Sequence, residues 1–95
     1  MIIVISTLRL WNGASASWHF IDVPLPEAAE ISAHSLLNRG GFGSVRVEAT
    51  IADVTWRTSV FPQKSGGYFL PVKAEVRRRA GISDGDEVAV ALELL

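Results

Sequence analysis

The fold is decided by residues 68–95, which read YFLPVKAEVRRRAGISDGDEVAVALELL. Pro71 should end a first strand, because proline has no N–H to donate to a β-ladder, and its fixed φ suits the first turn of a helix. Gly81 can adopt the left-handed conformation that closes such a helix. The apolar residues between them recur every four positions, as on one buried helical face. They are Val72, Val76 and Ala80.

The end of the same segment changes from a helical to a strand pattern. Asp84-Gly85 is a turn dipeptide, and from Glu87 onward apolar side chains occupy every second position. The alternating apolar residues are Val88, Val90, Leu92 and Leu94. Residues 68–95 therefore predict a strand, a short helix and a second strand, and the rest of the chain is expected to pack against them.

The N-terminal part of the chain predicts two strands and a helix. Residues 2–11 and 18–23 are rich in β-branched and aromatic side chains, and Asn12-Gly13 favours a hairpin between them with a loose loop. Pro26 suits the first turn of the helix that follows, and residues 38–43 should end it. The side chains expected to form its buried stripe are Ala29, Ala33, Leu36 and Leu37.

A second hairpin is predicted in the middle of the chain. Residues 44–51 and 54–61 alternate between apolar and polar side chains, and Ala52-Asp53 can form a two-residue turn. Such a turn fixes which residues lie opposite one another. The expected buried pairs are Val45 with Val60, Val47 with Thr58, Ala49 with Trp56 and Ile51 with Val54, and Glu48 faces Arg57 on the other side.

The two halves of the chain have the same order of elements, which suggests an internal repeat. Residues 20–24 read FIDVP before the first helix, and residues 67–71 read GYFLP before the second. Each helix is followed by glycine and a strand. We expect one domain, residues 1–95, with related halves of about 1–51 and 52–95. Its fold class should be mainly β, a β-barrel with two helices.

Two family resemblances support this architecture. Residues 70–90 resemble the repeat unit of the AbrB-like swapped-hairpin regulators, in which two units interleave into a double-split β-barrel. From about residue 7 to the end, the chain resembles the family catalogued as domain of unknown function 1905. The resemblance implies a double-split barrel formed within one chain as a monomeric pseudo-dimer, and it implies no particular activity. The motifs that carry it are WHFIDVP at 18–24, GFGSVRV at 41–47, TWRTSVFP at 55–62 and YFLPVK at 68–73.

Composition narrows the possible functions. The chain has 95 residues, a formal net charge of −1 and no cysteine, so disulfides and thiol chemistry are excluded. Two histidines without a spaced carboxylate partner predict no metal site, and no cofactor is expected. The apolar residues 1–5 lack a basic leader and a cleavage site and are expected to form a strand, and no run is long enough to span a membrane. A monomeric cytoplasmic domain is the default expectation.

A nucleic-acid-binding function is the first alternative. Arg77 and Arg78, together with Arg46, are the candidate phosphate contacts. However, successive helical residues are about 100° apart, so residues 77–79 fan over about 200° and cannot all face one phosphate track. The net charge also gives no broad basic footprint. A structural role at the C-terminal end of the helix is therefore favoured over nucleic-acid binding.

A hydrolase using His19 is a further alternative. Histidine is the usual acid–base group near neutral pH, and His19 could meet Ser59 or Asp22. No third orienting group is evident, so we assign no catalytic residue. His34, the other histidine, is expected to be exposed on the first helix.

The remaining candidates form a possible ligand cleft. In the expected register, Arg57, Ser59 and Phe61 share the strand face opposite Trp56. A face of mixed aromatic and polar groups can bind a ligand. Alternatively, Trp18 and Trp56 belong to the core and Arg57 only pairs with Glu48, which is the favoured interpretation. We therefore expect a small non-enzymatic accessory module with an unknown small ligand or protein partner. Its candidate contacts are Trp18, His19, Arg57, Ser59, Phe61 and Lys73.

Overall fold

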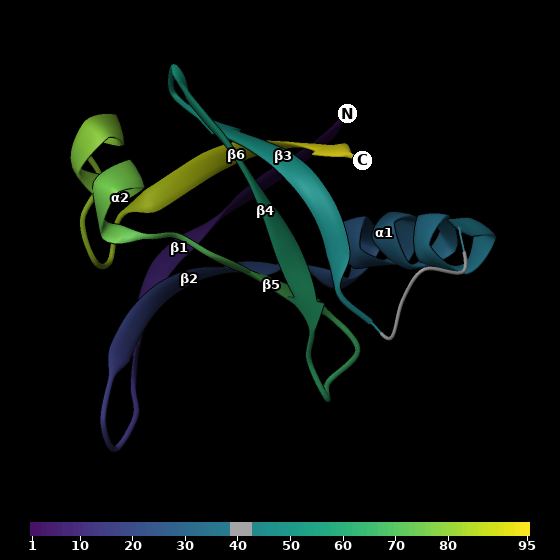
Figure 1. Ribbon diagram of the computed structural model, residues 1–95, viewed down its shortest axis with the longest axis horizontal. Coiled ribbons are helices and arrows are strands. Elements are labelled where there is room, and N and C mark those ends of the chain that lie inside the picture. The colour runs from purple at the N-terminus through teal and green to yellow at the C-terminus, as the bar shows by residue number, and fades with distance from the viewer. Residues whose placement is uncertain (39–42) are drawn as a thin grey trace.

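The computed structural model describes residues 1–38 and 43–95, which form six strands and two helices (Figure 1). The strands close into a barrel in the order β1-β2-β5-β4-β3-β6, and all neighbouring strands are antiparallel. The barrel with two helices confirms the predicted fold class. The elements are β1 (Ile2–Asn12), β2 (Ser17–Val23), α1 (Leu25–Asn38), β3 (Val45–Ile51), β4 (Val54–Pro62), β5 (Tyr68–Pro71), α2 (Ala74–Ala80) and β6 (Glu87–Leu94).

Two strands, β1 and β4, each change neighbour part of the way along. Residues 2–7 of β1 pair with β6, and residues 8–12 pair with β2. Similarly, residues 54–60 of β4 pair with β3, and residues 61–62 pair with β5. In this way two long strands connect the two sides of the barrel without leaving a free lateral strand edge between them.

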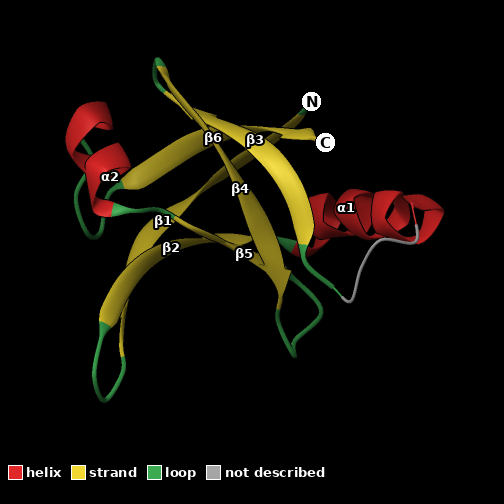
Figure 2. Ribbon diagram, in the orientation of Figure 1, coloured by secondary structure: helices red, strands yellow, loops and turns green. Residues whose placement is uncertain are grey.

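The ring of strands has an internal equivalence. If β1, β2 and β3 are exchanged with β4, β5 and β6, respectively, the order of neighbours around the barrel is unchanged. In both halves a hairpin of two strands leads into a helix and then into a third strand. Figure 2 shows α1 and α2 on opposite sides of the barrel. This arrangement is what two repeated strand–strand–helix–strand units would produce.

The β3–β4 hairpin has the predicted register. Ala49 lies opposite Trp56, and Glu48 lies opposite Arg57. Ala52 has a φ of 54°, and a two-residue hairpin turn requires a positive φ at its first position. All the other predicted pairs are also present. The turn therefore sets the register of the whole hairpin.

The core fills the interior of the barrel with apolar side chains from alternate strand positions. Fully buried examples, one from each of the six strands, are Leu8, Ile21, Val47, Val60, Leu70 and Leu92. Among the described residues, no polar or charged residue is buried. The alternation leaves the remaining side chains of each strand on the outer surface.

Helix α1 buries a different face from the predicted one. Ala28 and Ile31 contact the core, whereas Ala29 and Ala33 are exposed. The prediction was wrong for these two alanines because alanine is small enough to suit either face of a helix. The predictions for the side chains of Leu36 and Leu37, and for the segment after Asn38, fall outside the residues whose placement is described.

Helix α2 has the predicted end, but it begins later than predicted, so that Val72 precedes it, and Ala80 is half-buried. Val76 is buried, and Gly81 ends the helix with φ 71° and ψ 32°. The N–H groups of Gly81 and Ile82 donate to the carbonyls of Arg78 and Arg77 at 3.4 and 3.0 Å. The helix begins at Ala74, three residues after Pro71. Neither described helix is long and apolar enough to cross a bilayer.

Candidate ligand-binding site

A pocket lies on the outer surface of the barrel, over β1, β2 and β5. Its volume is about 430 Å³, within the range of small-molecule sites. Apart from one residue of the β4–β5 loop, its lining side chains come from the strand positions that alternate with the core positions. Figure 1 shows the β1–β2 hairpin and the β4–β5 loop projecting on the same side of the barrel. The lining residues are Arg9, Trp11, Trp18, Phe20, Asp22, Gln63 and Phe69.

Strand pairing places the aromatic side chains of the pocket side by side. Trp11 lies directly opposite Trp18, and their rings meet edge to face with centroids 5.7 Å apart and planes at 82°. Phe20 meets Phe69 of β5 in a similar edge contact at 5.9 Å. Phe69 also stacks on Phe61 of β4 at 5.5 Å. The aromatic surface therefore crosses four neighbouring strands.

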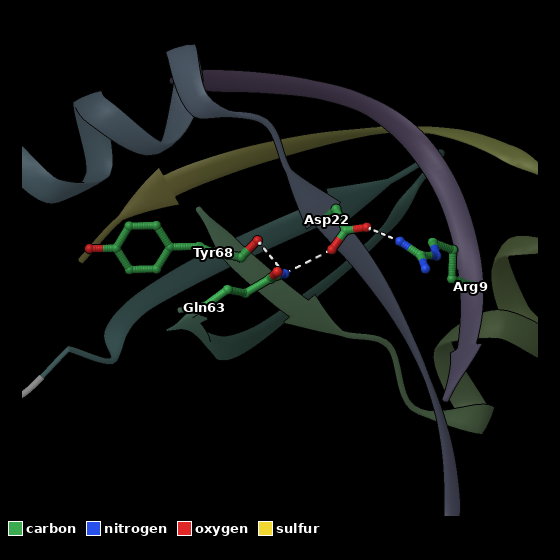
Figure 3. A network of polar contacts seen from close by, with 4 residues as sticks. All are labelled: Arg9, Asp22, Gln63 and Tyr68. Atoms are coloured by element: carbon green, nitrogen blue, oxygen red, sulfur yellow. Dashed lines mark hydrogen bonds and ion pairs between the residues drawn. The ribbon is translucent and has the colours of Figure 1, made fainter. Parts of the chain in front are cut away.

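A polar network fixes the floor of the pocket (Figure 3). Nη1 of Arg9 donates to Oδ2 of Asp22 at 2.6 Å, and Nε2 of Gln63 donates to Oδ1 at 2.8 Å. Nε2 of Gln63 also donates to the backbone carbonyl of Tyr68 at 3.3 Å. The guanidinium of Arg9 lies 5.5 Å from the ring centroid of Phe20, as a cation–π pair. Asp22 thus holds both polar neighbours in defined positions.

The network also determines which groups face the pocket. Because Nε2 of Gln63 contacts two acceptors, its amide has one consistent orientation, and both N–H groups are engaged. Each oxygen of Asp22 already accepts one hydrogen bond. In contrast, the indole N–H groups of Trp11 and Trp18 make no hydrogen bond within the described chain, and these side chains are 50% and 48% exposed.

Of the predicted contact residues, Trp18 is the one that lines the pocket. The favoured assignment of Trp18 to the core is wrong, because Trp18 is half-exposed, whereas Trp56 packs against the core. Phe61 adjoins the pocket through its stack on Phe69. His19 is the next residue after Trp18 in β2, so its side chain points to the other face of the strand. There its Nε2 lies 3.6 Å from Oδ1 of Asp84.

The other predicted contacts lie outside the pocket. Arg57 and Ser59 are on the outer face of β4, where Arg57 pairs with Glu48 at 3.5 Å and Ser59 lies opposite Arg46 of β3. Lys73 is exposed and precedes the first residue of α2. None of these three residues lines the pocket with Trp18.

The candidate nucleic-acid contacts do not form one surface. Figure 1 shows α2 and the beginning of β3, which carries Arg46, on opposite sides of the barrel. Nη1 of Arg77 donates to the carbonyl of Val72 at 2.6 Å, so this side chain is bound to the segment that leads into its own helix. Arg78 is exposed.

The partners considered for a catalytic His19 have other neighbours. Asp22 belongs to the pocket network, and Ser59 lies on the outer face of β4. His34 is half-buried rather than fully exposed, with Nε2 3.3 Å from the carbonyl of Leu95. Across residues 1–38 and 43–95, no cluster of three potential ligands from His, Asp or Glu is suited to a metal ion.

Sequence reasoning missed most of the polar residues of the pocket. Arg9 and Trp11 could have been found if the register of the first hairpin had been known, because they share the outer face with Trp18. Phe69 could have been found only if the pairing of β5 with β2 had also been known. Gln63 is in a loop, 41 residues from Asp22 in the sequence, and no local pattern connects the two.

Comparison with curated proteins finds no match for the chain. A family model described as Domain of unknown function (DUF1905) matches residues 5–92. The match includes all six strands in part or whole, both helices and every residue that lines the pocket. The chain belongs to the DUF1905 family.

Proposed function

We propose that the protein is a non-enzymatic binding module and that its ligand site is the pocket on the outer face of β1, β2 and β5. The observation that carries this proposal is the pair of half-exposed indoles, Trp11 and Trp18, beside a fixed polar network. Exposed aromatic side chains are unfavourable in water, and their clustering with positioned polar groups is typical of a recognition site.

The site is built for binding with little rearrangement. Asp22 holds Arg9 and Gln63, and the strand pairing holds the aromatic rings. A site that is ordered before the ligand arrives loses less conformational entropy on binding. The pocket has polar groups but no nucleophile paired with a base, which favours binding over catalysis.

The architecture is proposed to be an AbrB-like double-split barrel formed as a pseudo-dimer within one chain. The switch of neighbours in β1 and β4 and the equivalence of the two halves of the strand ring support it. Because the second half supplies the strands that a second subunit would otherwise provide, the module is proposed to act as a monomer in the cytoplasm.

The experiment uses the three tryptophans as reporters. The indole N–H groups give separate signals in a ¹H–¹⁵N NMR spectrum, and Trp11 and Trp18 line the pocket whereas Trp56 packs on the core. We would screen a library of small aromatic and heteroaromatic compounds, assign the signals with Trp→Phe variants, and record which indoles shift.

The proposal expects a subset of compounds to shift the signals of Trp11 and Trp18 in a saturable manner, with Trp56 unaffected. Arg9→Ala should weaken the binding of these compounds, whereas Arg57→Ala should leave it unchanged. The two arginines are a matched pair, because both are exposed and paired with a carboxylate, but of the two only Arg9 lines the pocket. Compounds that bind only elsewhere would contradict the proposal, and so would a lack of any shift at Trp11 and Trp18 with both this library and the peptides described below.

A further inference from the structure

We infer that the ligand of the pocket is a proline-rich peptide segment in the polyproline II conformation. This inference rests on the proposed function and adds the chemical class of the ligand. It follows from the hydrogen-bond donors that the pocket leaves free, from the arrangement of its aromatic rings and from the balance of its charges.

The pocket offers free hydrogen-bond donors beside its aromatic rings. The indole N–H groups of Trp11 and Trp18 are unpaired within the described chain, and Arg9 uses one of its five N–H groups in the bond to Asp22. Both oxygens of Asp22 already accept hydrogen bonds. A proline-rich segment is complementary to this set, because its carbonyls accept and its prolines have no N–H to donate.

The aromatic rings form a surface suited to proline rings. Trp11 and Trp18 meet at 82°, so their faces form a corner into which a compact apolar ring can pack. The surface continues through Phe20 and Phe69 to Phe61. Aromatic grooves of this kind recognise polyproline II helices, which lose little entropy on binding because they are already extended.

A nucleic acid matches the pocket less well. Arg9 and Asp22 are its charged lining residues, and they neutralise each other, so a phosphate backbone has no track of positive charge to follow. An uncharged proline-rich segment fits both the charge and the donors.

The test titrates the protein with a polyproline peptide of about ten residues, long enough for a stable polyproline II helix. A glycine–serine peptide of equal length is the control for a flexible chain. We expect the polyproline peptide alone to bind and to move the indole N–H signals of Trp11 and Trp18 downfield, as hydrogen bonding to carbonyls requires. Trp11→Ala and Arg9→Ala should each weaken binding about tenfold, and Arg57→Ala should leave it unchanged.

The outcomes separate the ligand class from the site. If the glycine–serine peptide binds equally well, or if the polyproline peptide shifts Trp56 instead, the inference fails. Binding of a maltooligosaccharide or of oligothymidylate at Trp11 and Trp18 in place of the peptide would also overturn the ligand class while supporting the site. If aromatic compounds and peptides all leave Trp11 and Trp18 unchanged, the site itself is wrong as well.

Discussion

Gly13 leaves the space that the indole ring of Trp11 occupies. A Cβ atom added at Gly13 would lie 2.5 Å from Cη2 and Cζ3 of that ring, closer than carbon atoms can approach. The N–H of Gly13 donates to the carbonyl of Ala16 at 2.7 Å and closes the hairpin loop. The glycine therefore contributes to the pocket by allowing Trp11 to fold back against its own loop and meet Trp18.

Gly13→Ala is expected to displace the Trp11 ring and to open its edge contact with Trp18. The nuclear Overhauser contacts between the two indoles should weaken, while the free energy of unfolding should change by less than about 1 kcal/mol because the loop is at the surface. Ala14→Ser, in the same loop, is the control. Unchanged indole contacts in Gly13→Ala would mean that the ring has another place to pack.

Leu8 and Leu10 lie two residues apart on the same face of β1, and together they test where the core ends along this strand. Leu8 is fully buried, whereas Leu10 is 43% exposed. Leu8→Ala should lower the free energy of unfolding by about 3 kcal/mol, because it removes buried apolar contacts and leaves a cavity. Leu10→Ala should cost less than about 1 kcal/mol. Urea denaturation measures both values, and equal losses would mean that the core extends along β1 as far as Leu10.

Substitutions at Asp22 and Glu48 compare two carboxylates, each of which pairs with an arginine. Asp22→Ala removes acceptors from both Arg9 and the half-buried Gln63 and should cost about 1 kcal/mol. Glu48→Ala removes only the exposed pair with Arg57 and should cost less than about 0.5 kcal/mol. Denaturant midpoints of the two variants give the comparison, and a larger loss for Glu48→Ala would argue against the pocket network.

Substitutions at Gly81 test the residue in left-handed conformation that ends α2. Its φ is 71°, and an added Cβ would have no atom within 4 Å. Gly81→Ala should therefore destabilise the protein by about 1 kcal/mol through the backbone conformation alone. Gly81→Asn should cost less, since asparagine tolerates this conformation better than alanine. Thermal or urea unfolding should give this ranking, and a neutral Gly81→Ala would show that the helix can end differently.

The two hairpins show why the fold could be predicted further than the site. The turn at Ala52-Asp53 has two residues, so it determines every pair between β3 and β4, and those pairs were predicted correctly. The first hairpin has a four-residue loop, residues 13–16, whose conformation does not follow from sequence. The pairing of Trp11 with Trp18, which creates the pocket, was therefore not predictable.

Helix α1 shows a second limit. Among the residues of α1 whose burial is described, Ile31 is the one large apolar residue on the buried face. Alanine is small enough to suit either side of the helix. The sequence of the helix therefore indicates only weakly which face is buried, and the predicted buried stripe lay on a different face from the observed one. In α2, by contrast, Val72, Val76 and Gly81 specify both the buried face and the end, and the prediction was correct.

The most direct measurement of the central claim is a crystal structure of the protein soaked with the aromatic compounds that bind in solution. The account predicts ligand density against Trp11 and Trp18, beside Arg9, with the bonds from Asp22 to Arg9 and Gln63 intact. Density confined to another surface, such as the side of β2 where His19 meets Asp84, would contradict it.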